Sequence, residues 1–171
     1  MAVPVDLDAP GGAYDPPPIF IHDFAPVPLD WLSAVGGFVA LLNPASLTEL
    51  VVDAWNAEAE AAAGHGLPLA ACRPDQIVAA VGRVRHRADA AIIPIAWSGV
   101  GMWVSPLEAD IEVARFGADR LHVHILGRSQ LPPTAPPQTA AASLHQRVTV
   151  AVVRHVLAAM VAKVTAEVPR R

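Results

Sequence analysis

Hydrophobic and polar positions alternate most regularly in the segment 107–128, LEADIEVARFGADRLHVHILGR. Leu, Ala, Ile and Val alternate with acidic residues before Gly117, and the apolar residues after it alternate with Arg and His. A period of two on both sides of a Gly/Asp turn predicts a β-hairpin. We therefore expect two antiparallel strands, with the apolar side chains on one face of a sheet and the charged side chains on the other.

The register of this hairpin follows from its turn. A 116–120 turn places Glu112 opposite His124. The same register places Glu108 opposite Arg128. Cross-strand pairs of this kind contribute little free energy and are typical of a solvated face. We expect this polar face to point to solvent and the apolar face to form one wall under the last helix.

Three further segments have strand patterns, at residues 19–25, 76–85 and 88–97. Pro94 lies inside the third segment, and proline has no amide hydrogen to donate to a neighbouring strand. The third segment is therefore predicted to be a sheet edge or to contain a bulge.

Two helices are predicted between the first and second strands. The apolar spacing of residues 29–43 is helical, but Gly36–Gly37 predicts a kink or break, since each glycine costs about 1 kcal/mol relative to alanine. Ser46 and Glu49 have the spacing of a capping box, which predicts the start of the second helix. This helix is expected to end at Gly64, because glycine is favoured just after a helix end.

The last helical segment, at residues 139–168, is apolar on more than half of its circumference and must be covered on more than one side. Because the other helices precede a run of antiparallel strands, the sequence predicts an α+β fold, with the sheet wrapped around the long C-terminal helix. The length of 171 residues fits one domain at 18–168. A disordered proline-rich tail at 1–17 and a short tail at 169–171 are expected to flank it.

Composition narrows the classes of partner. The net charge is −4, and no basic stripe predicts a nucleic-acid partner. Hydrophobic residues make up 53% of the chain and charged residues 16%, which favours a large core, an apolar cavity or an interface. The N-terminus lacks the pattern of a signal peptide, and Arg154 and His155 interrupt the longest apolar run, so no membrane span is expected. Cys72 is the single cysteine, which excludes an intramolecular disulfide and suits a reducing cytoplasm.

Five degenerate motifs follow one another along about half of the chain. They occupy Val81–Arg85, Ala90–Trp97, Leu107–Val113, Leu121–Gly127 and Leu144–Val148. In this order they resemble an uncharacterised bacterial branch of the SRPBCC superfamily, the START and polyketide cyclase-like proteins with the helix-grip fold. The resemblance implies an antiparallel sheet that grips the C-terminal helix, here with fewer strands than is usual. It also implies a cavity for a small apolar ligand between the sheet and that helix.

Tryptophans and arginines are the candidate ligand-binding residues. Trp31, Trp97 and Trp103 can line an apolar pocket, in which an indole N–H would orient a polar group of the ligand. Trp103 stands in a glycine-bearing loop of the kind that gates a cavity mouth. Arg83 and Arg85 alternate along a predicted strand, and an inward guanidinium would bind the polar end of an apolar ligand. The alternatives are an ordinary tryptophan core and an exposed arginine face.

Residues for catalysis or metal binding are sparse. His122 and His124 share a strand face with Glu112, but zinc and iron sites need three or four convergent ligands, so no metal site is predicted. His155, inside an apolar helix, is expected to be a satisfied core or interface histidine. No catalytic motif is matched. An enzyme would require His122, His124 or Asp110 to face inward.

The leading hypothesis is non-enzymatic binding or carriage of an apolar, lipid-like or polyketide-like molecule between the sheet and the C-terminal helix, without a cofactor. One alternative is a structural or regulatory subunit that uses the apolar C-terminal helix as a homodimer or complex interface. Another is a cyclase- or hydrolase-like enzyme in the same fold. The presence and lining of the sheet–helix cavity separate these hypotheses.

Overall fold

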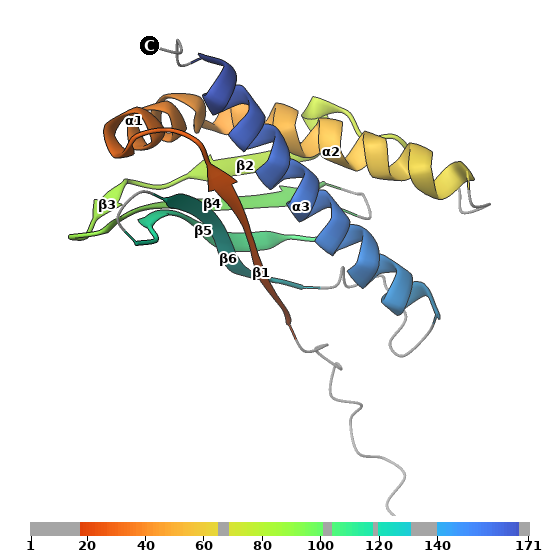
Figure 1. The fold of residues 1–171 in the computed structure, drawn as a ribbon. Helices are drawn as coiled ribbons and strands as arrows, with labels where there is room; N and C mark the ends of the chain where they lie inside the picture. The colour runs from red at the N-terminus through yellow and green to blue at the C-terminus, as the bar shows by residue number, and fades with distance from the viewer. Residues whose placement is uncertain (1–17, 65–68, 101–103, 118–119, 131–139, 168–171) are drawn as a thin grey trace, which may run out of the picture.

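The computed structural model describes residues 18–64, 69–100, 104–117, 120–130 and 140–167. The terminal tails predicted at 1–17 and 169–171 lie outside these residues. The described chain forms a six-stranded antiparallel sheet with three helices packed on one face, which confirms the predicted α+β class (Figure 1). The C-terminal helix crosses the sheet obliquely on that face.

The sheet order is β1-β6-β5-β4-β2, and β3 also pairs with β4. The strands are β1 (Ile19–Val27), β2 (Ile77–Val81), β3 (Arg85–His86), β4 (Ala90–Gly99), β5 (Leu107–Arg115) and β6 (Leu121–Ser129). The helices are α1 (Trp31–Leu41), α2 (Pro44–Gly64) and α3 (Ala140–Glu167), with a 3-10 turn, η1, at Pro74–Gln76. The first strand of the chain therefore lies beside the last one, at one edge of the sheet.

The hairpin of β5 and β6 has the predicted register. Glu112 pairs with His124, and Glu108 pairs with Arg128. Gly117 has a φ of +77°, in the left-handed region that glycine tolerates best. The odd-numbered residues of both strands point to the helices, and the even-numbered residues point away, so the predicted division into an apolar and a polar face is confirmed.

The segment predicted as one strand at 76–85 is two strands, β2 and β3, with a break between them. Of the two predictions for Pro94, the sheet edge is wrong, because β4 pairs with β5 on one side and with β2 and β3 on the other. The bulge agrees with the structure, since the register against β4 shifts by one residue between the pairs Val81–Ile95 and Arg85–Ile92. Pro94 lies opposite the break, where its carbonyl accepts a hydrogen bond from the Gly82 amide at 2.7 Å. Pro94 has no amide hydrogen to donate, and it lies where the hydrogen bonds to the neighbouring strand are interrupted between β2 and β3.

Helix α1 runs through its two glycines without the predicted break. A Cβ atom at Gly37 would lie 2.5 Å from Val164 of α3, so glycine lets the two helices approach closely. Val164 is itself buried, and its packing offsets the low helix propensity of glycine. The carboxylate of Asp30 caps the helix by accepting a hydrogen bond from the Ser33 amide at 3.0 Å.

Helix α2 starts earlier than the predicted capping box. Asn43 is the cap, because its side-chain oxygen accepts from the Ser46 amide at 3.0 Å. Pro44 occupies the first helical position, where its fixed φ suits the helix and its missing N–H leaves no bond unmade. The axes of α1 and α2 differ by 87°, and α2 ends at Gly64 as predicted.

Helix α3 agrees with the predicted long C-terminal helix and completes the core. Its buried residues pack against the sheet and the other helices; they include Val153, Val156, Leu157, Met160 and Val164. By length and composition, residues 143–167 of α3 pass the test for a membrane-crossing helix, and so do α1 and α2 taken together. Within the described structure, 39% of the apolar window of α3 is buried.

Candidate functional site

The space between the sheet and α3 beside Trp97 is nearly filled. A hollow of about 10 Å³ remains there, and the described residues that line it are Trp55, Trp97, Val104, Ser105, Thr149 and Val152. Pockets for small molecules measure roughly 300–1,000 Å³. This part of the chain therefore gives no support to the predicted ligand cavity between the sheet and α3.

A buried polar cluster borders this small hollow. It consists of Ser105, which follows the loop after β4, and of His145 and Thr149, one turn apart on α3. The Ser105 hydroxyl lies 2.6 Å from Nε2 of His145 and 2.8 Å from the Thr149 hydroxyl. All three residues are buried, so each of these hydrogen bonds is protected from water.

One hydrogen bond of this cluster has a fixed direction. The Thr149 hydroxyl can donate to the carbonyl oxygen of His145 at 2.9 Å, because a carbonyl can only accept. The Ser105 hydroxyl can donate or accept in its bonds with Thr149 and with Nε2 of His145, according to the tautomer of the ring. The cluster joins Ser105, just before β5, to α3 by buried hydrogen bonds.

Burial lowers the pKa of His145 below its ordinary value of 6.5. The charged form of an imidazole is disfavoured in a site with little water, so the ring is held neutral around pH 7. His145 therefore contributes to the specificity of packing between α3 and the sheet.

A much larger hollow, of about 710 Å³, lies where the start of α1 meets the end of the β5–β6 hairpin. The described residues lining it are Leu29, Asp30, Trp31, Leu32, Arg115, Arg120 and Leu121. We call this the Trp31 hollow. Its volume falls within the range of small-molecule pockets, and its lining combines an indole and leucines with two guanidiniums. It has the composition of a site for a molecule with an apolar body and an anionic group.

The two arginines of the Trp31 hollow contact aromatic rings. The guanidinium carbon of Arg115 lies 5.0 Å from the centroid of the Trp31 ring, and that of Arg120 lies 6.0 Å from the Phe116 ring. Within the part of the chain that the structure describes, neither guanidinium forms an ion pair. The nearby carboxylate of Asp30 instead accepts from the amide and the hydroxyl of Ser33.

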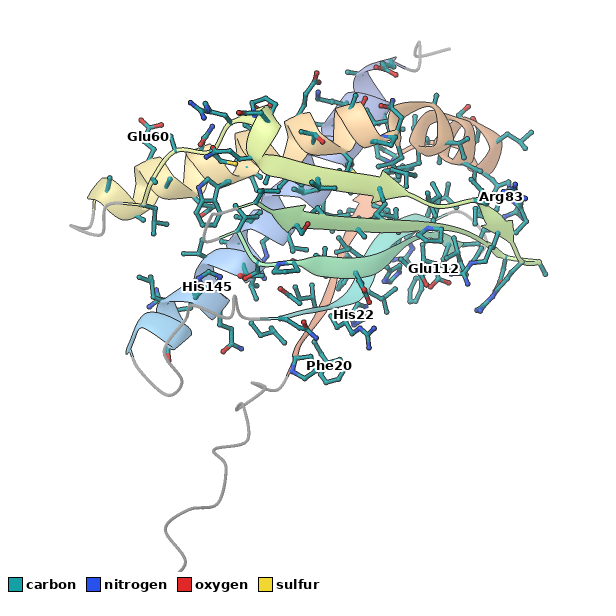
Figure 2. The ribbon with its side chains drawn as sticks, turned by 180° about the vertical axis from the view of Figure 1, so that it is seen from behind. Phe20, His22, Glu60, Arg83, Glu112 and His145 are labelled. Atoms are coloured by element: carbon teal, nitrogen blue, oxygen red, sulfur yellow. The ribbon has the colours of Figure 1, made fainter. Side chains whose placement is uncertain are left out.

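The predicted ligand-binding residues do not come together. Trp31 lines the Trp31 hollow, whereas Trp97 is buried under α3. Arg83 and Arg85 are both exposed, which agrees with the alternative of an exposed arginine face and not with an inward guanidinium. Figure 2 shows Arg83 at the end of the molecule opposite His145. Trp103 lies outside the described residues.

Several histidine predictions have clear outcomes. His122 and His124 point away from the helices, as the register predicted. His155 is exposed, with Nδ1 3.8 Å from a carboxylate oxygen of Glu58, so its assignment to the core is wrong. Among the described residues, no group of three or more His, Cys, Asp or Glu side chains is already placed to hold a metal ion.

The face of the sheet away from the helices, which we call the open face, is uncovered in the described structure. Phe20, His22 and Glu112 lie on it (Figure 2). A shallow groove of about 630 Å³ runs across it, with Pro94 and Leu126 in its lining. Two ion pairs border the groove. Arg128 binds Glu108 at 2.7 Å, and Arg85 reaches across β4 to bind Asp110 at 2.9 Å.

The residues that the sequence analysis missed carry different signals. Arg115 continues the inward series of β5, which is apolar up to Val113, and a charge at an inward position is a detectable exception. Ser105 and His145 carry no such signal, because they are 40 residues apart and only the tertiary fold joins them. Arg120 follows the turn, where arginine is unremarkable in a sequence.

Comparisons with known proteins identify no relative of this chain. No family model, no curated protein and no solved structure matches the chain.

Proposed function

We propose that this protein is a non-enzymatic binding protein for a small apolar molecule that carries an anionic group, and that the ligand occupies the Trp31 hollow. The observation that carries this proposal is the pair of arginines, Arg115 and Arg120, beside an indole and leucines in a hollow of about 710 Å³. A carboxylate is the group that a guanidinium binds best, because the two planar forks match.

The apolar part of the lining supports the same class of ligand. Leu32 is 79% exposed on the first turn of α1, and Trp31 is half-buried beside it. Both side chains would lose contact with water when an apolar chain or ring enters the hollow. Burial of apolar area contributes about 25 cal/mol per Å². The ligand would thus be held by apolar contacts and fixed in direction by its anionic end.

This proposal keeps the ligand class that the helix-grip resemblance implies and changes the place of the ligand. The resemblance itself stays a prediction. The Trp31 hollow lies at the end of the sheet, beside the start of α1, whereas the hollow next to Trp97 is about the size of one water molecule.

The alternatives have weaker support in the described residues. An enzyme in this fold would need His122, His124 or Asp110 to face inward, but all three face away from the helices. An assembly interface on α3 would need an exposed apolar side. The large exposed apolar residues lie instead on the open face, on α1 and in nearby loops, and include Phe20, Phe24, Leu32, Val39 and Val78.

Binding of octanoate, measured by calorimetry and by tryptophan fluorescence, tests the proposal, with octan-1-ol as the matched neutral ligand. We expect octanoate to bind about 10–100 times more tightly than octan-1-ol, because hydrogen bonds to charged groups contribute about 1.5–3 kcal/mol. Arg115→Ala and Arg120→Ala should each weaken octanoate binding about tenfold or more. Trp31→Ala should weaken both ligands.

Arg83→Ala is the matched control, because Arg83 is an exposed arginine that does not line the Trp31 hollow. Octanoate affinity should be the same in this variant as in the original protein. If the Arg115→Ala/Arg120→Ala double variant binds octanoate as tightly as the original protein does, the ligand does not occupy the Trp31 hollow. Failure of both octanoate and 1-naphthoate to bind saturably would refute the proposed ligand class.

A further inference from the structure

The two central strands of the open face carry rows of side chains with opposite charge. The row of β5 on this face is acidic and consists of Glu108, Asp110 and Glu112. The row of β6 contains the basic groups and consists of His122, His124, Leu126 and Arg128. The line between β5 and β6 therefore divides the centre of the open face into an acidic half and a basic half.

The rows on either side of these two strands are apolar. On β1, Phe20 is 81% exposed and Phe24 is 55% exposed. Figure 2 shows Phe20 beside the start of β1, at the rim of the sheet. On β4, beyond the acidic row, Pro94 and Ala96 line the groove of about 630 Å³, which extends from Phe20 across the strands to Ala80. One side of the open face thus has an exposed aromatic ring, and the other side has the hollow part of the groove.

The strand registers place one member of each row on a single line across the sheet. Phe20 pairs with Arg128, Arg128 pairs with Glu108, and Glu108 pairs with Ala96. Along this line the side chains are apolar, basic, acidic and apolar. A second copy, turned by 180° about an axis parallel to the strands and between β5 and β6, would place Phe20 over Ala96 and Arg128 over Glu108. The line is therefore complementary to itself under this rotation.

We propose that the open face is the interface of a symmetric homodimer, in which two sheets pack face to face about this two-fold axis. Each Phe20 would enter the part of the groove beside Ala96 of the second copy. The two Arg128–Glu108 ion pairs would meet with their charges alternating, so that each charge has an opposite neighbour in both chains. A two-fold axis makes each of these contacts twice. An axis at right angles to the strands would instead put one acidic row on the other, and like charges repel.

The overlapping surface is large enough for a weak dimer. Strands β1, β6, β5 and β4, each of nine or ten residues, would overlap with their counterparts. At about 3.3 Å per residue and about 4.8 Å between strands, they cover about 600 Å² on each copy, and the total of about 1,200 Å² is the lower limit for specific interfaces. We therefore expect a dissociation constant on the order of 10 µM, so that single chains predominate near 1 µM, with the open face in water.

This interface differs from the interface on α3 that the sequence analysis raised, and it is separate from the Trp31 hollow. The lining of the Trp31 hollow contains none of the open-face residues named above. Ligand binding in that hollow and dimerisation through the open face can therefore be tested independently, and the failure of one leaves the other standing.

Sedimentation velocity of the purified full chain, at concentrations from about 1 to 300 µM, tests the proposal. We expect the mass to rise with concentration from that of one chain, 17.9 kDa, toward twice that value. Phe20→Ala should weaken dimerisation about tenfold or more, because aromatic side chains that fill a pocket carry much of the energy of an interface. A chain that stays monomeric at the highest concentration would overturn the proposal, and the open face would then meet solvent or a different partner.

Charge reversal tests the contact between the two chains directly. In Glu108→Arg the new arginine would face Arg128 of the second copy, and in Arg128→Glu the new glutamate would face Glu108, so each variant alone should be monomeric. An equimolar mixture of the two variants should form dimers again, because every arginine of one chain then faces a glutamate of the other. Circular dichroism checks that both variants are folded. A mixture of folded variants that stays monomeric would overturn the proposal.

A control variant on the opposite side of the molecule separates this interface from one on α3. Ala158 is exposed on α3, and glutamate is a good helix former, so Ala158→Glu adds a charge there without disturbing the helix. Dimerisation of Ala158→Glu should equal that of the original protein. Loss of the dimer in Ala158→Glu, together with its persistence in Glu108→Arg, would place the interface on α3 and overturn the proposal.

Discussion

The two faces of the sheet are built from the same strands and differ in how their polar groups are satisfied. On the covered face, Ile111, Val123 and Ile125 are fully buried. The buried polar side chains there are hydrogen-bonded: Ser105, His145 and Thr149 to one another, and Ser129 to the Pro106 carbonyl. On the open face, charged side chains pair across strands and remain largely in water. One face therefore depends on packing and complete hydrogen bonding, and the other on weak, independent pairs.

This difference determines where binding can evolve without loss of the fold. A change on the covered face disturbs many contacts at once, because core residues touch many others. A change on the open face or at the end of the sheet disturbs only one pair or none. The Trp31 hollow lies outside the packed interior, where a change of side chain costs least in stability.

The largest difference in stability should be between substitutions at two neighbouring residues of β6, one pointing to the covered face and the other to the open face. Ile125→Ala should cost about 2–5 kcal/mol in the free energy of unfolding, because it creates a cavity in the core. Leu126→Ala should cost about 1 kcal/mol or less, since Leu126 is 36% exposed. Urea denaturation measures both. Equal losses would mean that another surface covers the open face in solution.

The buried network should give the next largest effect. Ser105→Ala removes one hydrogen bond from Nε2 of His145 and one from the Thr149 hydroxyl, and loss of buried hydrogen-bond partners costs about 1–3 kcal/mol. Ser98→Ala, on the outward side of β4, is the matched control and should change stability by about 0.5 kcal/mol or less. A Ser105→Ala protein as stable as the original would show that water replaces the hydroxyl.

Acidification should lower the free energy of unfolding by a smaller amount, through His145 on the covered face. Because the folded-state pKa of His145 is below the unfolded value of 6.5, the unfolded chain takes up a proton first as the pH falls. Stability from this group is complete above pH 6.5 and decreases as the pH drops from there toward the folded pKa. Urea midpoints between pH 7.5 and 5 should fall less in His145→Gln than in the original protein. In the control variant His155→Gln, the urea midpoint should change with pH as it does in the original protein. A His145→Gln protein whose midpoint changes with pH just as much would show that His145 is not the group responsible.

The smallest effect should come from the cross-strand pair of Arg128 and Glu108. Their side chains are 62% and 68% exposed, and exposed pairs contribute about 0.2–1 kcal/mol. A double-mutant cycle with alanine at both positions should give a coupling of that size, and 1 M NaCl should reduce it. A coupling that is larger and insensitive to salt would indicate that the open face is shielded from solvent.

Local patterns predicted the elements whose structure depends on near neighbours. The β5–β6 register follows from its own turn, and the end of α2 follows from Gly64. Predictions failed where a distant contact decides. Gly36–Gly37 does not break α1, because Val164 needs the space at Gly37. Pro94 does not mark an edge, because the break between β2 and β3 accommodates it.

The candidate site was less predictable than the fold for the same reason. Trp31 was predicted to line a cavity between the sheet and α3 and instead lines the Trp31 hollow, where Arg115 and Arg120 are about 85–90 residues further along the chain. The pairing of Val27 with Leu121 places the end of β1 beside the hairpin end, and α1 starts from there. No spacing rule in the sequence joins these segments, so the hollow exists only at the level of tertiary structure.

The position of β1 also has a consequence for how the chain folds. β1 pairs only with β6 within the described sheet, and Ile19 must find Ser129. On a ribosome, the first strand therefore waits without its partner until most of the chain has been made. Closing so large a loop is costly in entropy before any contact stabilises it, which slows folding and exposes strand edges meanwhile. The β4–β5–β6 meander, whose turns are local, is expected to form first and to serve as the template onto which β1 docks last.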